Sequence, residues 1–196
     1  MRIAITGSIG SGKSEVGKIL AKLGYPVIDT DVLAAEVLQR GSVVYEMLVK
    51  EYGEEILASD NSINKPFLAN LIFTDSQAKD KVEGLMHPEI WRSVELICAQ
   101  YQNNELVFVE VPLLFETNSQ GLFDRSVVVL AKQDIALQRL IDYREIKRAE
   151  ASRRWAKQMD PALKMELADD VIFNNAGIDE LEIRVQDYAK KLEKLR

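Results

Sequence analysis

The sequence contains one cysteine and one histidine in 196 residues. A single cysteine, Cys98, excludes an internal disulfide. One cysteine with one histidine also cannot supply the four ligands of a structural zinc site. Disulfide redox chemistry and structural zinc are therefore set aside.

Long hydrophobic runs are also missing, and no apolar stretch approaches the length that spans a membrane. The first residues are typical of a core strand and not of a charged start followed by a removable apolar segment. The hydrophobic content of 47% is enough to build a core, and the length suits one compact domain with a small inserted subdomain. We therefore expect a soluble, cytoplasmic protein without a membrane partner.

Positive charge is in deficit, and the net charge of −6 disfavours a nucleic-acid partner. The charge is unevenly distributed, because residues 138–157 hold seven basic and three acidic side chains, a local net charge of +4. This stretch predicts a local anion site. The alternative is a solvated helix face with internal ion pairs.

The most informative segment that is present runs from residue 3 to residue 14, where an apolar strand leads directly into Gly-x-x-x-x-Gly-Lys-Ser. Gly7, Gly10 and Gly12 carry no Cβ, so the backbone can take positive φ values and aim N–H groups at phosphate oxygens at a helix N-terminus. Lys13 then supplies a positive charge for the β- and γ-phosphates, and the Ser14 hydroxyl is a ligand for Mg²⁺. A glycine-rich turn without a ligand is the alternative, but the strand before it and the amphipathic helix after it favour a nucleotide site.

Strand and helix patterns alternate along the chain as they do in parallel α/β proteins. The sequence predicts five strands, at residues 2–6, 26–28, 106–111, 126–131 and 170–173. It predicts helices at residues 31–40, 43–52, 66–74, 76–85 and 88–102, with a turn at 61–64 and Pro88 in a first helical turn. In the last segment Asp179 and Glu182 resemble a capping box, followed by an apolar stripe at Leu181, Val185, Tyr188, Leu192 and Leu195.

Polar residues follow several of these strands, and in such sheets ligands lie beyond the carboxyl ends of the strands. Asp29 and Asp31 follow the second strand, where one of them can cap a helix and leave the other to meet a substrate hydroxyl. We expect Asp31 to be that base. Glu110, at the end of the third strand, is expected to hold Mg²⁺ or its waters, with structural pairing as the alternative.

Taken together, these segments resemble the dephospho-coenzyme A kinases, a family of P-loop kinases, over nearly the whole chain. The resemblance rests on residues 6–14, Leu23-Gly24, residues 28–31, Leu68-Ala69, Ile72-Phe73, His87-Pro88, residues 112–116, Gln158, residues 168–172 and Asn174-Asn175. It implies a P-loop NTPase three-layer α/β/α fold with a five-stranded parallel sheet. The implied parts are a nucleotide-binding core (1–30, 105–137 and 168–196), a helical coenzyme-A-binding region (31–104) and a helical lid (138–167).

The resemblance also implies ATP and Mg²⁺ as cofactors and dephospho-coenzyme A as the substrate, phosphorylated on its ribose 3′-hydroxyl; the oligomeric state stays open. The implied catalytic residues are Lys13, Asp31, Arg139 and Arg144, and Ser14 and Glu110 would hold the metal. The implied ATP-binding residues are Gly10, Ser11, Gly12, Lys13, Ser14, Glu15, Asn174 and Asn175. The implied substrate-binding residues are Asp31, His87, Leu113 and Glu116.

The sequence departs from the family pattern at several positions. Four residues after Arg139 the family usually has a second arginine, where this chain has Tyr143, so that Arg144 or Arg148 would take that part. Glu15 replaces a usual threonine and places a carboxylate near the phosphates, although a helix N-terminus tolerates it. Lys65 replaces a usual arginine.

Two other functions remain open from the residues alone. One is a kinase for another small acceptor, such as a nucleoside monophosphate. The other is a guanine-nucleotide switch, suggested by Ala131-Lys132-Gln133-Asp134 after a strand. The first residue of that tetrapeptide is not the expected asparagine, and no Asp-x-x-Gly follows the third strand, which argues against the switch.

Overall fold

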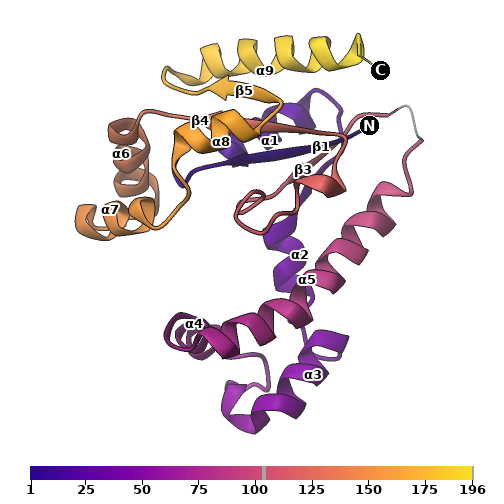
Figure 1. Cartoon of the computed structure of the whole chain (residues 1–196), viewed down its shortest axis with the longest axis vertical. Coiled ribbons are helices and arrows are strands. Elements are labelled where there is room, and N and C mark those ends of the chain that lie inside the picture. The colour runs from indigo at the N-terminus through magenta and orange to yellow at the C-terminus, as the bar shows by residue number, and fades with distance from the viewer. Residues whose placement is uncertain (103–104, 196) are drawn as a thin grey trace. The chain divides into compact units, whose positions relative to one another are not determined.

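The computed structural model describes residues 1–102 and 105–195. The chain divides into two compact units (Figure 1). The first unit is Met1–Asp29 with Tyr101–Arg196, and the second is Thr30–Gln100.

The first unit is built on a sheet of five parallel strands in the order β2-β3-β1-β4-β5. The strands are β1 (Arg2–Gly7), β2 (Val27–Asp29), β3 (Val107–Glu110), β4 (Arg125–Leu130) and β5 (Asp170–Phe173). Each of the five predicted strands is present within two residues of its expected bounds. β3 and β4 are apolar on both faces, and Phe108, Val109, Val127 and Val128 are fully buried. The prediction of a five-stranded parallel α/β sheet is therefore confirmed.

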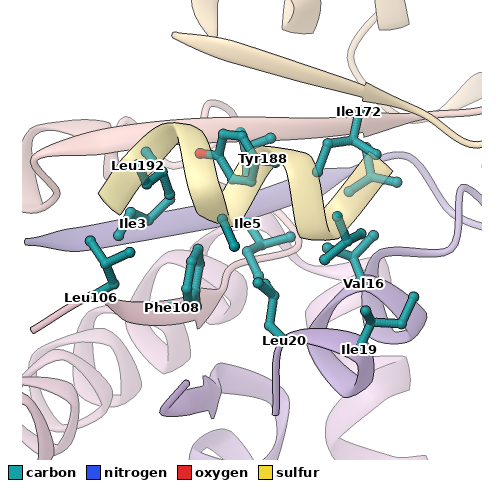
Figure 2. Packing of buried hydrophobic residues seen from close by; sticks show 14 of the residues in the cluster. Ile3, Ile5, Val16, Ile19, Leu20, Leu106, Phe108, Ile172, Tyr188 and Leu192 are labelled. Carbon is teal, nitrogen blue, oxygen red and sulfur yellow. The ribbon is translucent and has the colours of Figure 1, made fainter. Parts of the chain in front are cut away.

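The first unit also contains helices, several of which pack against this sheet. They are α1 (Lys13–Lys22), α6 (Gln133–Arg144), α7 (Arg148–Ala156), α8 (Pro161–Leu167) and α9 (Ile178–Glu193), with a short 3₁₀ turn at Gln120–Leu122. Figure 2 shows Tyr188 and Leu192 of α9 gathered with Val16 and Leu20 of α1 and Ile5 of β1. This apolar cluster fixes α1 against the sheet, and α1 is the helix that follows the glycine-rich loop.

The predicted capping box of α9 is wrong. The helix begins at Ile178, with Gly177 as its N-cap and no side-chain capping bond, so Asp179 lies inside the first turn. Its carboxylate there still interacts favourably with the helix dipole. The apolar stripe is confirmed except at Leu195, which is 52% exposed because it lies beyond the helix end at Glu193.

The second unit is helical throughout its described elements. These are α2 (Thr30–Glu36), α3 (Val43–Tyr52), a 3₁₀ turn (Gly53–Ile56), α4 (Lys65–Thr74) and α5 (Ser76–Cys98). The turn expected at 61–64 is present, and Asn61 adopts a positive φ of 61° there. α2 ends four residues before the predicted end, because the Ser42 hydroxyl bonds the carbonyl of Val37 and also caps α3.

The prediction of two helices at 76–85 and 88–102 is wrong, because α5 runs unbroken from Ser76 to Cys98 with Pro88 inside it. Proline has no N–H to donate to the carbonyl four residues earlier, which belongs to Gly84. The helix continues past this missing bond because Val82, Ile90 and Val94 on either side of it are buried. In residues 1–102 and 105–195, no helix has both the length and the apolar character needed to cross a membrane.

Candidate nucleotide-binding site

The site begins where β1 ends and the chain turns through glycines into α1. Gly10 and Gly12 have φ angles of +77° and +94°, which glycine adopts without strain. Both positions are also crowded, since a Cβ on Gly10 would lie 2.4 Å from the Ala136 carbonyl oxygen and one on Gly12 2.1 Å from Asn174 Nδ2. Gly12 is the N-cap of α1 and makes no side-chain capping bond, which suits the first amides of the helix to an anion.

Lys13 and Glu110 lie together beside this loop. Lys13 Nζ is 3.6 Å from Glu110 Oε2, and the two side chains are 15% and 7% exposed. Burial raises the pKa of Glu110 and the nearby Asp29 carboxylate adds to the increase, whereas the Lys13 ammonium and a hydrogen bond with Ser14 oppose it. The loop thus presents one cation and one buried carboxylate at the start of α1.

These side chains fit a magnesium ion by their chemistry. Mg²⁺ prefers oxygen ligands and is commonly bound through one or two protein groups together with substrate phosphates. Ser14 and Glu110 supply a hydroxyl and a carboxylate in mutual hydrogen-bond contact. No group of three or more acidic, histidine or cysteine side chains that could hold a metal occurs among the described residues. A cation here would therefore need phosphate oxygens to complete its ligands.

Asn174, directly after β5, joins the loop to α6. Its side-chain Nδ2 donates to the carbonyl of Ser11 at 2.8 Å, and its Oδ1 and main-chain oxygen accept from Arg139 at 3.2 and 3.1 Å. Arg139 also donates to the Ala176 carbonyl at 3.4 Å. The Asn175 side chain accepts from the Lys132 amide at 2.8 Å. Both asparagines therefore hold the protein chain around the loop, and direct contact with ATP stays a prediction.

The helices of the predicted lid also contact the loop. The Ile9 side chain packs against the cluster of Leu137, Leu140 and Ala151. The Ile9 amide donates to Gln158 Oε1 at 2.7 Å. Gln158 supported the family resemblance without an assigned role, and the structure gives it one, the support of the loop backbone.

The basic stretch 138–157 is partly an ion-paired helix face. Arg153 and Arg154 both pair with Glu150, at 2.5 and 2.8 Å. Arg144 and Arg148 are exposed on either side of Glu145, which adopts a left-handed φ of 52° between α6 and α7. Pairing within the stretch and exposed cations are what the solvated helix face predicts, and the anion site stays a prediction.

Glu15 lies in the first turn of α1, where the family usually has threonine. Its carboxylate pairs with Lys18 at 3.2 Å on the surface of that helix.

The remaining candidate residues lie in different elements. Leu113, in the turn after β3, is 44% exposed. Asp31 lies exposed in the first turn of α2, and His87 is half-buried within α5. Glu116 pairs with Lys164 Nζ at 2.7 Å. Its carboxylate therefore already has a cationic partner within the protein.

Sequence reasoning missed Lys164, whose side chain is fully buried in α8. Its neighbours Leu163, Met165 and Leu167 are between 41% and 49% exposed, so the short helix turns its lysine inward and its apolar residues outward. The only signal in the sequence was the position of a lysine among apolar residues. Hydrophobic periodicity predicts the opposite orientation.

We expect Lys164→Ala to lower the free energy of unfolding by about 3 kcal/mol, because removing one partner of a buried ion pair leaves the other charge without its counterion. Urea unfolding measures this change. Lys190→Ala is the matched control, since Lys190 pairs with Asp187 at 3.7 Å with both side chains at least 70% exposed. Such exposed pairs contribute about 0–1 kcal/mol to the free energy of unfolding. Equal losses in the two variants would contradict a special role for the buried pair.

Comparison with known proteins gives a consistent result. A family model described as dephospho-CoA kinase matches residues 1–180. The chain is 36% identical over 191 residues to the dephospho-CoA kinase of Oceanobacillus iheyensis, covering 96% of each protein. It is 32% identical over 194 residues to that of Listeria monocytogenes, covering 98% of this chain and 97% of the relative.

Solved structures show the same fold. A Thermus thermophilus protein, TT1252, superposes with a TM-score of 0.86 at 31% identity, over 98% of this chain and 97% of that one. A shikimate kinase from Acinetobacter baumannii superposes with a TM-score of 0.55 at 14% identity, covering 100% of this chain and 94% of that one. At that identity the second likeness concerns the fold alone, which is that of the P-loop kinases.

Proposed function

Because the chain belongs to the dephospho-CoA kinase family, we propose that it transfers the γ-phosphoryl group of ATP to the ribose 3′-hydroxyl of dephospho-CoA. The products would be coenzyme A and ADP. The observation that carries the proposal is the family match over residues 1–180, which includes the loop and the Lys13–Glu110 pair described above. We propose a cytoplasmic location as well, where such an enzyme would meet ATP.

In this mechanism the protein's main task is charge stabilisation. Phosphoryl transfer spreads negative charge over the oxygens of the transferred group, and preorganised donors oppose that charge. The amides of residues 10–14 and the Lys13 ammonium are the donors that α1 and its preceding loop would present. When phosphates approach, Lys13 would turn from Glu110 toward them, since its Nζ lies 3.6 Å from the carboxylate, beyond a short hydrogen bond.

Magnesium would be held by Ser14 and Glu110. When bound, Mg²⁺ neutralises charge on the phosphates and helps to orient them. The protein's own contribution is the carboxylate of Glu110, which is kept beside Ser14 by burial at the end of β3.

Asp31 would act on the acceptor. A carboxylate within hydrogen-bond reach of the 3′-hydroxyl can orient it and accept its proton. We assign residues 31–104 to binding of the coenzyme A part, with His87 as a contributing residue, and assign Leu113 and Glu116 to the acceptor as well. The lid, residues 138–167, would close over the phosphates and exclude water, a competing acceptor.

A coupled ADP-release assay with four acceptors tests the proposed reaction. Dephospho-CoA should give a kcat/KM far above those of adenosine, AMP and shikimate. A preference for AMP would instead support a nucleoside monophosphate kinase. Thermal shifts with ATP and with GTP would expose a guanine-nucleotide switch, because a ligand that binds the folded state raises its melting temperature.

The lid arginines provide a further prediction. Arg139→Ala and Arg144→Ala should each lower kcat by at least about 10²-fold, because positive charge is needed when the lid closes on the phosphates. Arg148→Ala is the comparison, since Arg148 lies on the other side of the α6–α7 corner. Steady-state kinetics and thermal unfolding would be measured together, because Arg139 also bonds Asn174 and Ala176.

The pattern of losses decides which arginine acts. A loss at Arg144 that exceeds the loss at Arg148 would mean that Arg144 replaces the arginine missing at Tyr143. The reverse order would reassign the role to Arg148. Normal kcat in all three variants would contradict a catalytic lid and leave this stretch as a solvated helix face.

A further inference from the structure

α1 contains a glycine in its interior, at a position where helices favour alanine. Gly17 lies four residues after Lys13 and three after Ser14, so it shares a helix face with both. It is buried. A buried interior glycine that weakens the helix calls for a steric explanation.

The surroundings of Gly17 provide that explanation. A Cβ built on Gly17 would lie 2.1 Å from Glu110 Oε1 and 3.0 Å from Glu110 Cδ, with Val27 Cγ1 3.3 Å away on β2. The first distance is far below any van der Waals contact. The carboxylate of Glu110 therefore occupies the space that a side chain at position 17 would fill.

This space matters because the same carboxylate lies 3.6 Å from Lys13 Nζ and contacts the Ser14 hydroxyl. An alanine at position 17 would force the Glu110 side chain to another rotamer or push it away from α1. Val27 limits how far the neighbouring side chains can adjust on the β2 side. The missing Cβ thus leaves the space in which the carboxylate lies beside the two loop side chains.

We propose that Gly17 is a positioning residue for the phosphate site: it admits a glutamate at position 110 and places its carboxylate beside Lys13 and Ser14. The proposal rests on the function proposed above in so far as those side chains act on ATP and Mg²⁺. The steric relation itself requires no ligand. A shorter acid at position 110 should therefore remove the need for glycine at position 17.

A double-mutant cycle tests this relation without substrate. In the wild-type background Gly17→Ala should lower the melting temperature, because overpacking of a filled site is destabilising. In the Glu110→Asp background the same change should raise it, since aspartate is one methylene shorter and the alanine methyl fills the gap. The sign of the effect therefore inverts between the two backgrounds.

A matched glycine controls for the helix itself. Gly84 in α5 is also inside a helix, but a Cβ there would meet nothing within 4 Å. Gly84→Ala should leave the melting temperature unchanged or raise it, because alanine is the better helix former. A drop as large as that of Gly17→Ala would point to a general cost of replacing helical glycines and would overturn the steric argument.

Nucleotide binding tests the positioning role. Isothermal titration of Gly17→Ala should show ADP binding without Mg²⁺ near the wild-type value, with a smaller gain when Mg²⁺ is added. The kcat should fall by about 10- to 100-fold, since a displacement of roughly 1 Å can cost about 10²-fold. The double variant G17A/E110D should recover part of both losses.

Two results would overturn the proposal. One is a folded Gly17→Ala protein with wild-type kcat and wild-type gain from Mg²⁺. The other is a change in melting temperature on Gly17→Ala that is the same in the wild-type and the Glu110→Asp backgrounds. If Gly17→Ala alone folds poorly, a double variant G17A/E110D that folds equally poorly would overturn the proposal as well. Because that comparison uses no substrate, a failure of the proposed kinase activity in the acceptor assay would be seen separately.

Discussion

Lys13→Ala should lower kcat by about 10² to 10³, the loss associated with removing one preorganised donor that stabilises transition-state charge. Lys13 is the cation that the glycine-rich loop presents, and its side chain is only 15% exposed. Water therefore replaces its ammonium poorly. The measurement is the coupled ADP-release assay with saturating dephospho-CoA.

The fold should survive this change. Without the Lys13 ammonium, the pKa of Glu110 rises further, because burial already raises it and Lys13 opposes that effect. A raised pKa favours the neutral carboxyl, which burial penalises less than the charged form. Circular dichroism would verify the fold, and a folded variant that keeps more than about a tenth of wild-type kcat would contradict the proposed role.

Lys18→Ala is the matched control on the same helix. Lys18 is 69% exposed and pairs with Glu15 on the surface of α1. Exposed ion pairs contribute about 0–1 kcal/mol to the free energy of unfolding, so this variant should stay folded. It should also keep wild-type kcat, because Lys18 has no proposed contact with the phosphates. A comparable loss in both variants would indicate a general electrostatic effect of α1 and not the specific action of Lys13.

The strands and the loop could be predicted from sequence because their determinants are local. Short apolar runs bounded by turn residues predict parallel strands, and the spacing of Gly7, Gly12 and Lys13 specifies the loop between β1 and α1. Pro88 shows the limit of such local rules. Proline usually marks a helix start, but here burial of residues on both sides of it keeps α5 continuous.

The parts of the site that sequence reasoning missed depend on contacts distant in the chain. Lys164 is buried because Glu116, far earlier in the sequence, supplies its counterion. The Glu110 carboxylate occupies the space beside Gly17, and Gln158 accepts from the amide of Ile9. No periodicity encodes these pairs, since each is fixed by how the sheet and its helices come together.

Asp31 is the residue whose proposed role concerns the acceptor and not ATP. If it orients the 3′-hydroxyl and accepts its proton, Asp31→Asn should lower kcat by about 10² to 10⁴. Asparagine keeps the size and shape of aspartate but cannot take the proton. Affinity for ATP, measured by isothermal titration, should stay near that of the wild type.

Asp29→Asn is the comparison that separates catalysis from structure. Asp29 ends β2 and lies in register with Glu110, whose pKa it helps to raise. Asp29 thus acts on Glu110 and has no proposed contact with the acceptor, so the loss of its carboxylate should lower kcat less than the loss of the Asp31 carboxylate does. Equal losses in the two variants, or a fall in ATP affinity with Asp31→Asn, would indicate a structural role in the first turn of α2 or metal binding in place of base catalysis, because a base acting on the acceptor should lower kcat with nucleotide binding unchanged.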